Sequence, residues 1–188
     1  MALPLFRARG ATNFSVTYDG DNLYPAAPDF HFLTPKVVAR LRDSADTQAF
    51  ISQLTIFGGQ NETPIRQAHA RLVVSYSIWE DTFTVAIPGL HSQEGLSAAK
   101  AESWCLENLA ISASGLDPNK PFRMRFELRP VRRTDLSRVL GDMGISIVSM
   151  IDIFSRKAGA GEETWTLETG WLRLIELPRL SGRPARHG

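Results

Sequence analysis

The chain has 188 residues, of which 43% are hydrophobic, and this length and composition fit one globular domain with a substantial core. Its 21 basic and 20 acidic residues give a formal net charge of +1, which argues against a protein whose whole surface binds polyanions. The single cysteine, Cys105, excludes a framework of intrachain disulfides, and no run of about 18 apolar residues predicts a transmembrane helix.

The N-terminal part of the chain predicts little regular structure. Residues 1–12 show no hydrophobic period and form an N-terminal segment. Residues 13–18 alternate apolar and polar side chains, which predicts a short strand. Residues 21–29 contain Pro25 and Pro28, and we expect a loop there because proline favours turns.

A helix, a strand and a hairpin are expected next. Thr34 followed by Pro35 is typical of a helix start, because threonine accepts an N–H bond at the cap and proline needs no partner at the first position. Residues 48–57 predict a strand. Residues 71–87 place apolar side chains at every second position on both sides of a polar break at 79–81, which indicates a β-hairpin with one buried face.

The second half of the chain combines a clear helix with two further strands. Residues 97–111 are rich in Ala, start with a capping Ser and space their apolar side chains for a helix. Residues 122–129 alternate throughout, so one face of that strand is apolar and the other is charged. Short amphipathic helices are expected at 135–143 and 147–154, and a long strand at 164–177.

Together these elements predict one α+β domain over residues 13–177, an antiparallel β-sheet or sandwich with three to four helices packed against it. The elements do not alternate regularly as in a parallel α/β fold. Residues 178–188 are rich in Pro, Gly and Arg, and we expect a disordered tail. Residues 1–6 are too short and too interrupted by proline for a signal-peptide core, although a chain whose signal had been removed would look the same.

Motifs for catalysis, metal binding and phosphate binding are missing from the sequence. The four His residues form no HxH, HxxxH or HExxH pattern, and there is no Cys pair. The stretch KAGAGEET at 157–164 lacks the GxxxxGK[ST] order of a phosphate-binding loop. We therefore assign no catalytic, metal or cofactor-binding residue, and an enzyme would need a site assembled from distant residues such as His69, Asp81 and Glu102.

The strongest chemical feature of the sequence is a row of arginines on the strand predicted at 122–129. Alternate residues of an extended chain lie about 6.6 Å apart, close to the phosphate spacing along a nucleic-acid strand, and a nearby aromatic ring would add base stacking. The near-neutral net charge favours the simpler interpretation, in which the arginines pair with Glu127 and with acids on neighbouring strands. The candidate binding surface comprises Trp79, Arg123, Arg125, Arg129, Arg132 and Arg133.

Three segments resemble the bacterial domain-of-unknown-function 4390 family, a group of uncharacterised and usually exported proteins. They are VSYSIWEDTFTV (74–85), ESWCLENLAI (102–111) with the FRMRFELRP strand after it, and the stretch from MIDIFSRKAG to ETWTLETGWLRL (150–174). The resemblance spans roughly residues 33–177 and implies no catalytic residues. It implies a non-enzymatic, envelope-associated role, although this sequence shows no N-terminal signal segment of the kind such proteins usually carry.

Three functions of different classes follow from these observations. The first is a non-catalytic interaction or accessory domain of the bacterial envelope, whose partner is another protein or a second copy of the chain. The second is a module that binds anions or single-stranded nucleic acid through the Arg123–Arg133 face. The third is an enzyme with a site assembled from distant residues. No cofactor is assigned, and the compartment is left open unless the family resemblance holds, in which case it is periplasmic or envelope-associated.

Overall fold

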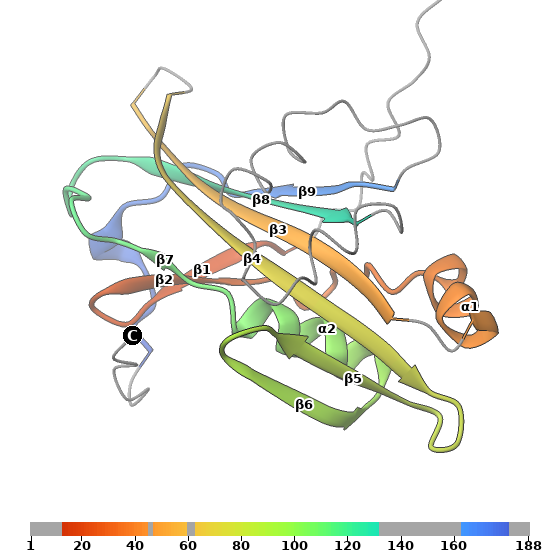
Figure 1. Cartoon of the computed structure of the whole chain (residues 1–188). Coiled ribbons are helices and arrows are strands. Elements are labelled where there is room, and N and C mark those ends of the chain that lie inside the picture. The colour runs from red at the N-terminus through yellow and green to blue at the C-terminus, as the bar shows by residue number, and fades with distance from the viewer. Residues whose placement is uncertain (1–12, 45–46, 60–62, 132–162, 181–188) are drawn as a thin grey trace, which may run out of the picture.

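The computed structural model describes residues 13–44, 47–59, 63–131 and 163–180, which contain nine strands in two antiparallel sheets (Figure 1). The larger sheet contains, in spatial order, β6 (His91–Leu96), β5 (Thr82–Ile87), β4 (Pro64–Ser77), β3 (Thr47–Gly58), β8 (Phe122–Pro130) and β9 (Trp165–Glu168). The smaller sheet contains β1 (Ser15–Tyr18), β2 (Asn22–Ala26) and β7 (Ile111–Ser112). The helices are α1 (Pro35–Ser44), α2 (Ala98–Glu107) and a short 3₁₀ helix, η1 (Leu174–Glu176).

One hydrophobic core joins these elements. Helix α2 and the smaller sheet lie on the same side of the larger sheet (Figure 1). Val16 and Leu23 of the smaller sheet, Cys105 of α2 and Phe126 of β8 all belong to this core. Phe30, which follows β2, packs edge-on against Phe126 with 5.6 Å between the ring centroids. We call this side of the larger sheet its apolar face.

Strand β3 is buried on both sides of the larger sheet. It pairs with β4 along one edge and with β8 along the other. Phe50 and Leu54 lie in the core on the apolar face, and Ile51 and Thr55 point the opposite way, yet none of the four is more than 2% exposed. We call that opposite side the polar face, because the arginines of β8 project from it.

The predicted helix starts are confirmed. Helix α1 begins at Pro35, and the Thr34 hydroxyl accepts the N–H of Val37 at 3.4 Å. Helix α2 begins directly after Ser97, whose hydroxyl faces the N–H of Lys100 at 3.4 Å. In both cases the capping residue satisfies N–H groups that the first turn leaves without a partner.

The predicted hairpin and the charged strand are also present. Strands β4 and β5 pair Val74 with Val85 and Tyr76 with Phe83 on the apolar face. Strand β4 is longer than expected, because it begins at Pro64. Strand β8 has the predicted alternation, since its apolar side chains are buried and the charged ones between them are partly exposed. An antiparallel fold with helices against the sheet is therefore confirmed.

The loop predicted over residues 21–29 is wrong for its first half, which forms β2. Pro25 pairs with Val16 of β1 within this strand. Strand β7 pairs only with Asn22 and Leu23, so the N–H that proline lacks interrupts no bond on that edge. Pro25 therefore lies beyond the pairing with β7 but does not prevent β2 from pairing with β1.

Two predicted elements end earlier than expected. Helix α2 stops where the side chain of Asn108 donates a hydrogen bond to the Trp104 carbonyl at 2.8 Å. Strand β9 stops before Thr169, whose hydroxyl accepts the N–H of Met124 at 2.9 Å in place of a backbone carbonyl. At the end of α2 the Asn108 side chain adds to the bond that its own backbone N–H makes with the Trp104 carbonyl at 3.2 Å. At the end of β9 the Thr169 hydroxyl takes the place of a backbone carbonyl.

The expected number of helices is not supported. The described residues contain two α-helices, and the helices predicted at 135–143 and 147–154 lie outside the described residues. Among the described residues, no helix has the length and hydropathy needed to cross a bilayer. Strand β6 was not predicted, because four of its six side chains are exposed and no apolar alternation marks it.

We predict that Phe126→Ala lowers the free energy of unfolding by about 3–5 kcal/mol, because the ring is fully buried against Phe30. Urea denaturation would measure the loss. Thr166→Ala, at an exposed position of the neighbouring strand β9, is the control and should change stability by less than about 0.5 kcal/mol. A loss below about 1 kcal/mol for Phe126→Ala would contradict its place in the core.

Candidate functional site

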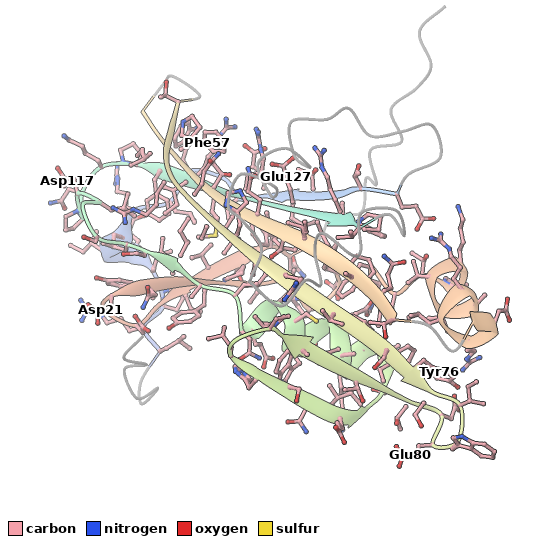
Figure 2. All side chains as sticks on the ribbon, in the orientation of Figure 1. Asp21, Phe57, Tyr76, Glu80, Asp117 and Glu127 are labelled. Carbon is pink, nitrogen blue, oxygen red and sulfur yellow. The ribbon has the colours of Figure 1, made fainter. Side chains whose placement is uncertain are left out.

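The turn between β4 and β5 presents the most exposed large apolar side chain of the described residues. Trp79 is 98% exposed, and its neighbour Ile78 is 57% exposed. The sequence pattern placed Ile78 on the buried face of the hairpin, but β4 ends at Ser77 and Ile78 already belongs to the turn. We call residues 78–81 the tryptophan turn, which projects beyond the end of the sheet (Figure 2).

The conformation of the tryptophan turn is held by side chains behind it. Asp81 has a φ of 52°, in the left-handed region that a non-glycine residue adopts only with support. The Tyr76 hydroxyl donates a hydrogen bond to the Asp81 carboxylate, and Nη2 of Arg42 donates to the same oxygen at 3.0 Å. The Arg42 guanidinium also lies over the Tyr76 ring, 5.0 Å from its centroid. Helix α1 is thereby connected to the turn.

These contacts shift the titration of both acids in the cluster. The hydrogen bond from Tyr76 lowers the pKa of the Asp81 carboxyl, and the positive charge of Arg42 lowers it further. The same hydrogen bond raises the pKa of the Tyr76 hydroxyl. At neutral pH, Asp81 is therefore an anion and Tyr76 a neutral donor, which is the combination that holds the turn.

The arginines of β8 are already paired within the molecule. Arg123 and Arg125 both bind Glu168 of β9, with nitrogen–oxygen distances of 2.5 and 3.3 Å. Arg129 lies 4.0 Å from Glu127. The structure thus supports the simpler interpretation for these three arginines, while Arg132 and Arg133 lie outside the described residues.

Aromatic rings further restrict two of these arginines. The guanidinium groups of Arg123 and Arg125 lie 5.4 and 4.7 Å from the centroid of Phe57. Arg123 also lies 5.6 Å from the centroid of Trp171. Trp79 belongs to the hairpin turn and not to this group, so the structure does not combine it with the arginines into one surface.

Arg71 of β4 is a further basic residue of the polar face. Cross-strand pairing places it opposite Ile51, which in turn lies opposite Arg129. Its Nε and Nη1 atoms are buried and have no hydrogen-bond partner. Burial lowers the pKa of this guanidinium. The sequence analysis did not select Arg71, although its alternation with Leu72 on β4 marks it as a residue of the polar face.

The structure does not bring His69, Asp81 and Glu102 together. His69 lies on the polar face, where its Nε2 contacts Gln53 at 2.9 Å. The eight residues of β4 that follow His69 span about 26 Å, and Asp81 lies beyond the end of that strand. Glu102 belongs to α2, on the opposite side of the sheet.

Glu102 instead fixes the chain that leads into α1. The residue is only 3% exposed, and its Oε1 accepts the backbone N–H groups of Phe32 and Leu33 at 2.7 and 2.6 Å. Its Oε2 lies 2.7 Å from Nδ1 of His31. Burial, with a further contribution from Glu102, raises the pKa of Cys105 to about 12, so that thiol stays protonated.

No group of three or more His, Cys, Asp or Glu side chains within the described ranges is arranged to hold a metal ion. Comparisons of the chain with protein-family models, with curated proteins and with solved structures find no match. The functional argument therefore depends on the residues themselves. The sequence analysis selected Trp79 but missed Arg42, since a contact between residues 39 positions apart leaves no local signal.

We predict that Glu102→Gln destabilises the protein by about 1–3 kcal/mol, because a neutral amide replaces a buried carboxylate that accepts two backbone N–H bonds. Chemical denaturation at neutral pH would measure it. Glu94→Gln, on the exposed edge strand β6, removes the same charge without a buried bond and should have almost no effect. Equal effects of the two variants would show that Glu102 contributes only charge.

We also predict that the Asp81 carboxyl stays ionised below its ordinary pKa of 3.8 and that Tyr76→Phe raises its pKa towards that value. Because the folded-state pKa is lowered, the carboxylate stabilises the turn above the unfolded pKa, and this contribution is lost as the pH falls through the folded value. An NMR titration of the side-chain carboxyl carbon measures both proteins. An unchanged titration in Tyr76→Phe would contradict the assignment.

Proposed function

We propose that the protein is a non-catalytic interaction domain that binds another protein through the tryptophan turn. The observation that carries the proposal is a fully exposed Trp79 on a turn that three other side chains hold in place. An association with the bacterial envelope is part of this proposal, and the resemblance to the domain-of-unknown-function 4390 family supports it.

The energetics of binding favour this surface. Tryptophan is enriched among the few residues that dominate protein interfaces, because one ring buries a large area with little loss of side-chain freedom. Association is costly when loops must be ordered. Asp81, Tyr76 and Arg42 already fix the turn, so most of that cost is met in the folded protein.

The charges around Trp79 indicate the chemistry of the partner. Glu80 and Asp81 directly follow the ring, and the nearby Arg42 is engaged by Asp81. An anionic membrane surface would repel these two carboxylates. A protein with an apolar pocket and a basic rim would instead complement both the ring and its acidic flank.

Anion binding at the polar face is the second candidate function. The observation in its favour is that Nε and Nη1 of Arg71 are buried without a hydrogen-bond partner. In the part of the chain that the structure describes, four arginines (Arg71, Arg123, Arg125 and Arg129) stand against the two carboxylates of Glu127 and Glu168 on these strands of the polar face. The candidate ranks second because Arg123 and Arg125 share Glu168, so an anion would have to displace an existing ion pair.

We predict that Trp79→Ala abolishes binding of the partner without changing the free energy of unfolding by more than about 0.5 kcal/mol. Proteins from the source cells would be captured on the immobilised wild-type chain and on each variant, and quantified by mass spectrometry. Leu90→Ala is the matched control, because Leu90 is 63% exposed in the β5–β6 turn, at the opposite end of β5 from Trp79. A partner should be lost with Trp79→Ala and retained with Leu90→Ala.

Two results would overturn this assignment. Capture of the same proteins by the wild-type chain and by Trp79→Ala would remove the tryptophan turn from the interface. A blue shift of tryptophan emission on adding neutral phospholipid vesicles, present in the wild type and missing in Trp79→Phe, would assign the turn to a membrane surface instead. Sedimentation of the purified chain shows whether it self-associates, and so separates that case from both of these outcomes.

A further inference from the structure

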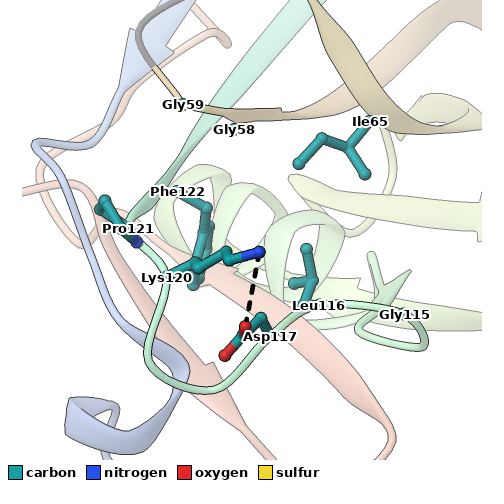
Figure 3. A pocket seen from close by; sticks show the side chains of 9 residues that line it. All are labelled: Gly58, Gly59, Ile65, Gly115, Leu116, Asp117, Lys120, Pro121 and Phe122. Atoms are coloured by element: carbon teal, nitrogen blue, oxygen red, sulfur yellow. Dashed lines mark ion pairs between the residues drawn. The ribbon is translucent and has the colours of Figure 1, made fainter.

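A pocket of about 240 Å³ lies at the opposite end of the β3–β4 hairpin from α1, beside the loop that leads into β8 (Figure 3). It is separate from the tryptophan turn, which follows the other end of β4. Its lining residues are Gly58, Gly59, Ile65, Gly115, Leu116, Asp117, Lys120, Pro121 and Phe122.

Glycines keep this pocket open. A Cβ atom on Gly58 would lie 2.2 Å from Cδ1 of Ile65, so any larger residue would displace the side chain that forms one wall. Gly59 and Gly115 have φ values of +70° and +81°, which other residues adopt only with strain. The backbone of the pocket is therefore exposed at three places where a side chain would otherwise fill the space.

The walls of the pocket are apolar and fit one hydrophobic group. Phe122 is 2% exposed, while Ile65 is 52% exposed and Leu116 packs partly against the core. In Figure 3 the side chains of Ile65 and Leu116 face each other across the pocket. An apolar cavity of about 150 Å³ already holds a benzene ring. A pocket of about 240 Å³ therefore has room for a ring and a short polar head.

One basic and one acidic group stand at the mouth of the pocket. Oδ2 of Asp117 lies 3.7 Å from Nζ of Lys120, which is longer than a charged hydrogen bond. The other oxygen of Asp117 accepts the N–H of Asn119 at 3.0 Å and so fixes the loop. The side chain of Asp117 is 44% exposed and that of Lys120 is 80% exposed, and both keep hydrogen-bonding capacity for a ligand.

We propose that this pocket binds a small zwitterion with an apolar side chain, such as a free apolar amino acid. The apolar group occupies the space between Ile65, Leu116 and Phe122. The ligand carboxylate pairs with Lys120, and the ligand ammonium pairs with Asp117. A peptide terminus offers only one of these two charges, so the combination of an acid and a base selects the free amino acid.

The test uses L-phenylalanine as the probe, with 3-phenylpropionate and phenethylamine as analogues that each lack one charge. NMR titration of the full chain would follow the backbone amides of Gly58, Gly59 and Gly115. We expect saturable shifts of these three signals, and binding of phenylalanine about fivefold tighter than of either analogue, since an exposed ion pair contributes about 1 kcal/mol at most.

Matched variants test which charge of the ligand pairs with Asp117 and which pairs with Lys120. Asp117→Asn keeps an oxygen that accepts the Asn119 N–H, so the loop is retained while the negative charge is removed. It should weaken phenylalanine about fivefold and leave 3-phenylpropionate no weaker. Lys120→Gln should weaken phenylalanine equally and leave phenethylamine no weaker, and Lys100→Gln, on the exposed side of α2, should change nothing. Shifts that do not saturate, or equal binding of all three probes, would overturn the proposal.

Discussion

Strand β3 is hydrogen-bonded along both edges and covered on both faces, and the other elements take their positions from it. Its pairing with β4 and β8 sets the register of the larger sheet. Phe50 and Leu54 on its apolar face provide a surface that α2 and the smaller sheet cover. A strand with no exposed side tolerates neither a register slip nor a charged substitution, so its sequence defines the two faces of the molecule.

The two faces of the larger sheet satisfy their polar groups in different ways. On the apolar side, the buried carboxylate of Glu102 is satisfied by backbone N–H groups and has no spare capacity for chemistry. On the polar side, Glu168 pairs with two arginines at once. Two groups of the described residues that are available to a ligand or partner lie at opposite ends of the larger sheet, Trp79 at one and the pocket with Lys120 at the other.

The candidate site was only partly predictable. Trp79 was selected from the sequence at the break of the predicted hairpin, and it lies exposed in the turn there. The support beneath it comes from Arg42 of α1, and no local pattern relates that residue to Asp81. The arginine row of β8 was predicted as a face, yet its pairing with Glu168 depends on β9 lying next to β8.

Local patterns determined the hairpin, the two helix starts and the alternation of β8, because capping and side-chain periodicity depend on neighbours in the sequence. They did not determine β2, β6 or the early end of β9. Those elements depend on which strand lies alongside, as Thr169 shows by replacing a backbone partner of Met124. Only the tertiary structure decided which charges are neutralised and which side chains stay exposed, because residues distant in the sequence supply the partners.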